Sequence, residues 1–221
     1  MKYMYCWIVL VLVCIPHLGY SKNNSFPLLP VKTDWQRIDI TDLGSIDLPP
    51  TLEIQGLEYK KGMDNYRAFG KIPVLVAQQK ELNNGDKESS KRYARVMIET
   101  IYGKDGDFEK LNFNIKKLRV DSIGQLDKDL KTQCDKGLNK INQKLIEWYP
   151  VTLEKINGMS CIHISYTRQL YNNPVEKVDL YRFQNNDRIH GLILSYRISE
   201  SEIWKNDFDA VLKSFRVSNI R

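Results

Sequence analysis

The sequence predicts an α+β fold, with a central antiparallel sheet flanked by helices, in a chain of 221 residues. In the last third, strand-like runs alternate apolar and polar residues and are joined by short turn sequences such as "NG" and "NND". Two other segments repeat apolar residues every three or four positions, as helices that cover a sheet do. With 42% apolar and 27% charged residues, the chain is long enough to bury one good core.

The N-terminus has the pattern of a secretory signal peptide. Lys2 precedes an apolar run that ends at Ile15, and a polar stretch begins at Ser21. Because this run is shorter than the roughly 20 residues of a membrane span, we expect a cleaved signal peptide at residues 1–21. The chain is therefore expected to be exported to the periplasm or cell envelope, or secreted.

Two alternatives to cleavage stay open. The apolar run could be retained as an anchor, which would then be the contact of the chain with the membrane. Cys14 could carry a lipid, although Val13 stands where lipoprotein processing needs a small residue. The net charge of +6 is weak evidence for anionic partners, and export makes nucleic acid an unsuitable one.

Residues 22–34 are polar and contain proline, so we expect an irregular lead-in before a single domain over residues 35–221. The domain opens with two short extended runs, "QRIDI" and "SIDLP", which two prolines end. Two longer runs, "IPVLVAQQKEL" and "RYARVMIETIYG", flank a turn-rich separator and predict an antiparallel hairpin. Arg95 and Glu99 share one face of the second run, which we expect to be solvated.

A long helix is expected from Asp121 to Asn142. Apolar residues recur along one side at Ile123, Leu126, Leu130, Cys134, Leu138 and Ile141. Four strand-like runs follow and predict an antiparallel meander: "PVTLEKING", "MSCIHISYTRQ", "EKVDLYRFQ" and "RIHGLILSYRI". The helix is expected to cover this sheet.

A final helix is expected after the meander. Ser199 and Glu202 have the spacing of a capping box. One helical stripe is formed by Trp204, Phe208, Val211, Leu212 and Phe215. Because the preceding strands offer a sheet to cover, we interpret this stripe as core and not as a binding face. The residues "SFRVSN" could then return as a short strand.

The order of these elements resembles the PsbP-like superfamily. The resemblance spans residues 35–217 and is carried by "SIDLPPTLEI", "INGMSCIHISYT", "VDLYRFQNNDRIHGLILSYR" and "FDAVLKSFRV". This superfamily includes an extrinsic subunit of photosystem II, a Ran-binding protein and DcrB-type envelope proteins. The resemblance implies a central antiparallel sheet with helices on both sides, and a history of binding rather than of catalysis.

The sequence lacks the motifs of common enzymes. Neither G-x-G-x-x-G nor G-x-x-x-x-G-K occurs, so we expect no nucleotide or other cofactor. A metal site would need more ligands than Cys134, Cys161 and His163 provide, and we expect none. Ser165, His163 and Asp179 could approach one another on neighbouring strands, but no G-x-S-x-G elbow accompanies them. We therefore expect no catalytic residues.

Two cysteines remain after the expected signal peptide, Cys134 and Cys161. In an oxidising compartment they could form a disulfide. Cys134 falls on the apolar side of the expected helix and Cys161 lies in an expected strand, so both could instead be small buried apolar side chains. The sequence leaves both alternatives open.

Tyrosine and arginine gather in the expected meander. Both bury a large area while keeping a polar group, and both are frequent in protein interaction sites. We therefore expect an interaction face made of Tyr166, Arg168, Tyr181, Arg182, Tyr196 and Arg197. The alternative is that these are ordinary residues of a sheet.

These features together predict an exported, non-enzymatic binding protein of the bacterial cell envelope. It would act through a protein partner, as an accessory subunit, an effector chaperone or an immunity protein. The alternatives are a small envelope hydrolase and a membrane-anchored structural protein of the envelope.

Overall fold

The computed structural model of the chain describes residues 34–56, 59, 71–81, 92–109 and 120–221. The larger sheet consists of β3 (Leu52–Ile54), β4 (Lys71–Gln79), β5 (Ala94–Tyr102), β6 (Gln143–Ile156), β7 (Met159–Leu170), β8 (Glu176–Asn185) and β9 (Arg188–Arg197). The smaller sheet consists of β1 (Gln36–Ile40), β2 (Gly44–Leu48) and β10 (Arg216–Val217). The helices are α3 (Val120–Asn139) and α4 (Ser201–Ser214), and a 3-10 turn, η3 (Ile198–Glu200), leads into α4. The expected signal peptide lies outside the described residues.

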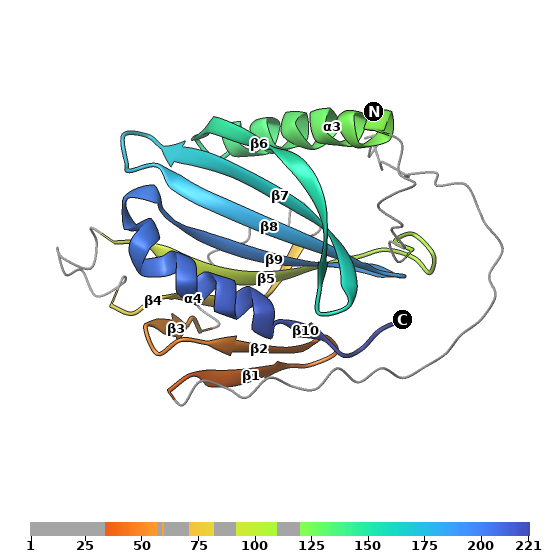
Figure 1. Cartoon of the computed structure of the whole chain (residues 1–221), viewed down its shortest axis with the longest axis horizontal. Coiled ribbons are helices and arrows are strands. Elements are labelled where there is room, and N and C mark those ends of the chain that lie inside the picture. The colour runs from red at the N-terminus through yellow and green to blue at the C-terminus, as the bar shows by residue number, and fades with distance from the viewer. Residues whose placement is uncertain (1–33, 57–58, 60–70, 82–91, 110–119) are drawn as a thin grey trace.

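Neighbouring strands of the larger sheet are antiparallel, in the order β3-β4-β5-β9-β8-β7-β6. The smaller sheet is also antiparallel and has the order β1-β2-β10. Figure 1 shows α3 alongside β6 at one edge of the larger sheet, while α4 lies near β2 and β10. The α+β class, the hairpin of β4 and β5, and the meander from β6 to β9 are all as predicted.

The short turns of the meander explain its tight antiparallel pairing. Asn157 and Gly158 join β6 to β7 with φ of 49° and 83°, which suits a two-residue hairpin turn. Asn186 between β8 and β9 has a φ of 61°. Asparagine and glycine tolerate this left-handed region at little cost, so these residues fix where each strand ends.

Helix α4 packs on one face of the larger sheet, which we call the α4 face. Its residues Trp204, Phe208 and Val211 are buried, as is its C-cap Phe215, so the predicted stripe is core. They share a hydrophobic cluster with strand residues of both sheets: Ile46, Leu48, Val96, Ile98, Cys161, Tyr181, Phe183, Leu192 and Leu194. Burying each large side chain stabilises the fold by roughly 1.5 to 3 kcal/mol.

Helix α3 packs on the opposite face, which we call the α3 face. Leu130 and Leu138 are buried, and Leu126 and Cys134 are partly buried against the same cluster. The strand side of this cluster is formed by Val151, Ile164, Tyr166, Val178 and Leu180, with Leu145, Trp148, Ile162 and Ile193 beside them. The two helices therefore cover opposite faces, because neighbouring residues of a strand point to opposite sides of a sheet.

Two boundaries differ from the prediction. Helix α3 ends at Asn139 and β6 already begins at Gln143, whereas the sequence analysis extended the helix to Asn142. Asn142 has a φ of 57°, and this left-handed residue sits in the turn that separates the two elements. The predicted capping box is also absent, because Glu200 is the N-cap of α4 and makes no capping bond.

The β5 face that carries Arg95 and Glu99 is not the solvated surface that we expected. Glu99 is only 1% exposed, and Met97 beside it is equally buried. Met97 packs with Val76, Ile193 and Tyr59. Glu99 pairs across the sheet with Gly191, where an added Cβ would lie 3.0 Å from the Glu99 Cγ. The missing side chain at Gly191 makes room for the buried carboxylate.

Candidate functional site

The predicted interaction face does not exist as one surface. Tyr166, Arg168 and Tyr181 are buried, and Arg182, Tyr196 and Arg197 are partly exposed. Strand pairing and packing place Tyr181 and Tyr196 on the α4 face and the other four residues on the α3 face. The sequence already contained this information, because Tyr181 and Arg182 are adjacent in one strand and must point to opposite sides.

Several members of this group have structural partners. The Arg168 Nε donates to Glu176 across the β7–β8 pair at 2.9 Å. Tyr166 stacks on Trp148 with ring centroids 6.1 Å apart. Tyr196 meets the edge of Phe208 from α4 at 5.7 Å. These contacts favour the alternative interpretation, in which most of these tyrosines and arginines hold the sheet together.

The two cysteines do not form a disulfide. Cys134 and Cys161 are both free thiols, and they belong to the hydrophobic clusters on opposite faces of the larger sheet. Burial raises the pKa of the Cys134 thiol to about 11 and that of the Cys161 thiol to about 12, so both stay protonated. They are small apolar side chains of the core, which was the second of the two alternatives.

Ser165, His163 and Asp179 come together on the α4 face, but not in the order that nucleophilic catalysis requires. The His163 Nε2 lies 3.0 Å from Asp179 Oδ1, and its Nδ1 lies 2.7 Å from Glu154 Oε1. Ser165 bonds to Asp179 rather than to His163. A nucleophilic serine needs a neutral imidazole nitrogen in reach, and here a carboxylate faces each ring nitrogen.

The electrostatics of this cluster stabilise a charged imidazole. Burial alone would lower the pKa of His163, but the hydrogen bonds and charges of Asp179 and Glu154 outweigh it, so the pKa is raised. Burial likewise opposes ionisation of Asp179, yet the hydrogen bonds from His163 and Ser165 lower its pKa. His163 also stacks on Tyr181 with ring centroids 4.3 Å apart. The imidazolium therefore joins β6, β7 and β8.

A cleft adjoins this cluster on the α4 face, and we call it the α4 cleft. Its volume is about 440 Å³. Strand residues form its floor: Lys177, Asp179, Tyr181, Leu194 and Tyr196. Helix α4 forms its wall: Ser201, Glu202, Lys205, Phe208, Asp209 and Leu212. The cleft thus combines both signs of charge with aromatic and aliphatic walls.

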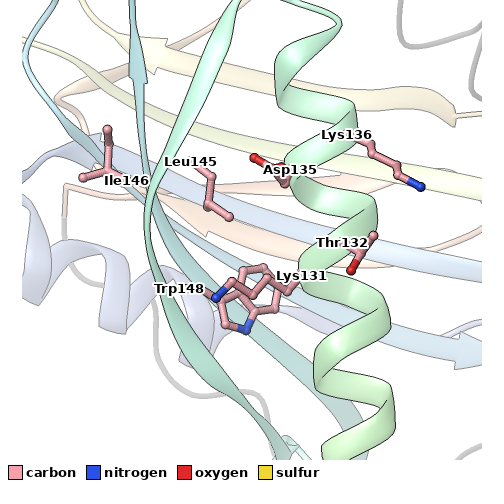
Figure 2. Close-up of a pocket in the computed structure, with 7 residues that line it drawn as sticks. All are labelled: Lys131, Thr132, Asp135, Lys136, Leu145, Ile146 and Trp148. Carbon is pink, nitrogen blue, oxygen red and sulfur yellow. The ribbon is translucent and has the colours of Figure 1, made fainter.

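A second concave surface lies on the opposite face, between α3 and β6, and we call it the α3–β6 groove. It has a volume of about 460 Å³ and is drawn in Figure 2. Lys131, Thr132, Asp135 and Lys136 line it from α3, and Leu145, Ile146 and Trp148 line it from β6. Figure 2 shows Leu145, Asp135 and Trp148 in the space between the strand and the helix.

Asp127 anchors the groove at one end. One carboxylate oxygen, Oδ1, accepts from the Trp148 indole Nε1 at 2.9 Å and from the Val151 backbone N at 2.8 Å. These bonds fix the Trp148 ring against Tyr166 and tie α3 to the middle of β6. The groove wall is therefore held in place by a partly buried hydrogen-bond network as well as by surface contacts.

Strand β6 forms one edge of the larger sheet. In the described part of the chain only β7 pairs with it, so its other edge carries backbone groups that no strand there satisfies. Two bulges interrupt its pairing, one at Ile146 and one at Pro150 and Val151. Bulges and proline limit unwanted pairing at sheet edges, and bulges also occur beside functional sites.

Sequence reasoning missed the groove because it left residues 143–149, the first half of β6, unassigned between the expected helix, which ended at Asn142, and the expected strand run, which began at Pro150. A signal was present in "KLIEWY", where Leu145 and Trp148 precede the recognised strand run. The sequence analysis also did not identify Lys177, because its position in the α4 cleft depends on contacts between elements that are distant in the chain.

The described residues contain no group of three or more His, Cys, Asp or Glu side chains arranged to hold a metal ion. Within the same ranges, neither α3 nor any other helix has the length and apolar character needed to cross a membrane.

Several solved structures have folds similar to that of this chain. Cyanobacterial PsbP (CyanoP) from Synechocystis is 14% identical, with 90% of this chain and 98% of that chain covered and a TM-score of 0.48. A protein from Bacteroides thetaiotaomicron is 11% identical, covers 78% of this chain and 44% of its own, and has a TM-score of 0.41. LpqN, involved in cell envelope biogenesis of Mycobacterium tuberculosis, is 11% identical, with coverages of 84% and 79% and a TM-score of 0.37.

No protein-family model matches the chain, and no curated protein matches its sequence.

Proposed function

We propose that this chain is an exported, non-enzymatic binding protein that captures an extended segment of a partner protein in the α3–β6 groove. The observation that carries the proposal is the edge of β6 beside this groove, with which no strand of the described residues pairs. An added strand would receive backbone hydrogen bonds from β6, and alternate side chains would enter the groove. Roles as an accessory subunit, an effector chaperone or an immunity protein all require such a surface.

The chemistry of the groove indicates the kind of segment that fits. Leu145, Ile146 and Trp148 offer apolar contact, and Ile146 is 45% exposed at the bulge. Lys131 and Lys136 outnumber Asp135 on the helix wall. We expect a segment with alternating apolar and acidic or neutral residues, because opposite charge guides docking and apolar contact holds it.

The proposal that the protein is non-enzymatic is supported by the geometry of His163. Both ring nitrogens face carboxylates, so His163 cannot serve Ser165 as a base without losing one of these contacts. Export is supported by the N-terminal pattern around Lys2 and Ser21. Sequencing the N-terminus of the protein purified from its native cells tests export, because cleavage predicts a chain that starts at Lys22.

Site-specific photo-crosslinking tests the groove. A photoreactive residue replaces Ile146 in one variant and Ile203 of α4, which is 50% exposed, in a matched control. Crosslinking in native envelopes should trap one partner at Ile146 and not at Ile203. Mass spectrometry then identifies the trapped peptide, which is synthesised for binding measurements.

The synthetic peptide should protect backbone amides of β6 from hydrogen exchange, because strand addition hydrogen-bonds them. An Ile146→Lys variant should bind it about tenfold more weakly, since a charge would enter an apolar contact, while Ile203→Lys should bind normally. Crosslinks that are equal at both sites, or a peptide that protects no β6 amide, would contradict the proposal.

A further inference from the structure

The α4 cleft is separate from the α3–β6 groove, because the two lie on opposite faces of the larger sheet. Its volume of about 440 Å³ falls within the roughly 300 to 1,000 Å³ typical of small-molecule sites. The inference below therefore does not depend on the proposed partner.

Lys177 presents a positive charge at the floor of this cleft. Its ammonium lies 3.6 Å from the centroid of the Tyr149 ring, and it forms no ion pair with any described residue. Burial lowers the pKa of Lys177, against the opposing charges of Asp179 and Glu147. A half-buried ammonium without a hydrogen-bonded counter-ion is costly, so a carboxylate placed there would be bound favourably.

The nearest acid on the floor cannot fill this role. The Asp179 carboxylate lies two residues along the same strand, but it already accepts from His163 at 3.0 Å and from Ser165. His163 is in turn shared with Glu154 at 2.7 Å. The acidic groups of the floor are therefore engaged with His163, and Lys177 remains available to a ligand.

The wall and rim define the rest of the ligand. Apolar surface comes from Tyr196 in the floor and from Phe208 and Leu212 in the wall. Glu202 and Asp209 are exposed carboxylates on α4 at the rim, on either side of Lys205. A ligand that suits this arrangement carries a carboxylate at one end, an apolar body and an ammonium at the other end.

We propose that the α4 cleft binds a small zwitterion, an amino acid or short peptide with an apolar side chain, whose carboxylate contacts Lys177 and whose ammonium faces Glu202 and Asp209. The apolar body lies against Tyr196 and Leu212. The same chemistry could come from a free amino acid or from a peptide, and the experiment distinguishes these sources.

Thermal unfolding of the full exported chain provides the first measurement. Each standard amino acid and a set of di- and tripeptides with the same C-terminal residues are added in excess, because a ligand that binds the folded state raises its melting temperature. At least one apolar amino acid or peptide should raise it. The ratio of free amino acid to peptide affinity, measured by calorimetry, identifies the source.

Calorimetry on analogues of the best probe tests the contacts. The amine that lacks the carboxylate should bind about tenfold more weakly, since it loses the charged contact with Lys177. The N-acetylated analogue should be weakened less, because the rim carboxylates are exposed to solvent. Equal binding of the decarboxylated amine would overturn the proposal.

Variants locate the site. Lys177→Met keeps an unbranched side chain over Tyr149 and should lose about tenfold in affinity. The control Lys213→Met lies on α4, the wall helix, but outside the cleft and should bind normally. If Lys177→Met does not fold, the double variant Glu202→Gln and Asp209→Asn at the exposed rim should still weaken binding several-fold. No response to any probe, or unchanged binding in these variants, would refute the site.

Discussion

His163 bonds to one carboxylate through each ring nitrogen and stacks on Tyr181, so a single side chain connects three strands of the sheet. This arrangement requires the protonated imidazole, because a neutral ring has only one N–H to donate. His190 is the opposite case. It is buried between Thr100 and Asn185, and burial lowers its pKa to about 4, so its neutral form is favoured.

The two histidines predict opposite pH dependences. Folding raises the pKa of His163 above its value of about 6.5 in the unfolded chain. The charged imidazole therefore stabilises the fold fully below about pH 6.5, and this stabilisation is lost as the pH rises through the pKa of the folded state. His163→Gln should therefore lower the free energy of unfolding by about 1 to 2 kcal/mol near pH 6 and by less near pH 9.

His190→Gln is the control for this experiment. The neutral His190 stabilises the fold above about pH 6.5, and this contribution falls as pH drops toward the folded pKa of about 4. The difference between wild type and His190→Gln should therefore shrink with acidity, whereas the difference for His163→Gln should not. Urea denaturation at several pH values measures both. Parallel pH profiles for the two variants would show that His163 is not held as the imidazolium.

At the residue scale, the sequence identifies partners in strands only in part. Ser165, His163 and Asp179 could be recognised as neighbours from alternation and strand order. The hydrogen bonds of His163 could not be predicted in the same way. Glu154 reaches His163 only through the register of β6 on β7, and a bulge at Pro150 and Val151 shifts that register. The prediction that six tyrosines and arginines form one interaction face failed for a simpler reason. Alternation places adjacent residues of a strand on opposite faces of the sheet.

At the scale of elements, the apolar patterns predict which surfaces pack. The stripe of α4 and the period of α3 both lead to the observed clusters, because burial of large side chains determines how a helix faces a sheet. The start of β6 was missed because "INQKLIEW" lacks strict alternation, and α3 supplies the apolar contact for Leu145 and Trp148 that makes it a strand. Tertiary packing here outweighs local pattern.

Glycine substitutions test the pairing of elements. A Cβ built at Gly44 of β2 would collide with the backbone oxygen of Arg216 in β10, and Gly44 has a φ of 157°. Gly44→Ala should therefore destabilise the fold by about 2 kcal/mol or more, through strain and loss of the β2–β10 pair.

Gly124 of α3 is the matched control, because a Cβ added there meets no atom within 4 Å. Gly124→Ala should stabilise the fold by roughly 0.5 to 1 kcal/mol through helix propensity. Equilibrium denaturation of both variants measures whether the free energy of unfolding falls or rises. A neutral Gly44→Ala would mean that β10 separates from β2 at little cost.

At the scale of the whole molecule, the larger sheet separates two hydrophobic clusters. Each has its own helix and its own thiol, Cys161 with α4 and Cys134 with α3. The same separation places the α4 cleft and the α3–β6 groove on opposite sides, so the molecule could hold a small ligand and a partner at once.

This separation predicts that oxidation does not stabilise the fold. The chain from Lys22 onward should melt at the same temperature with and without a reductant, because its two thiols cannot approach across the sheet. Both thiols should react with a thiol reagent only after denaturation, since burial raises their pKa to about 11 and about 12. A lower melting temperature in reductant, with a thiol count of zero before it, would contradict this arrangement.

The smaller sheet joins segments from the two ends of the described chain. Asp47 of β2 donates its backbone N–H to Ser214 of α4 at 2.9 Å across 167 positions of sequence, and β2 also pairs with β10. The cluster that α4 closes therefore cannot be completed until the ribosome has made α4. A chain built in this way keeps the surface that α4 covers open until this helix has been synthesised.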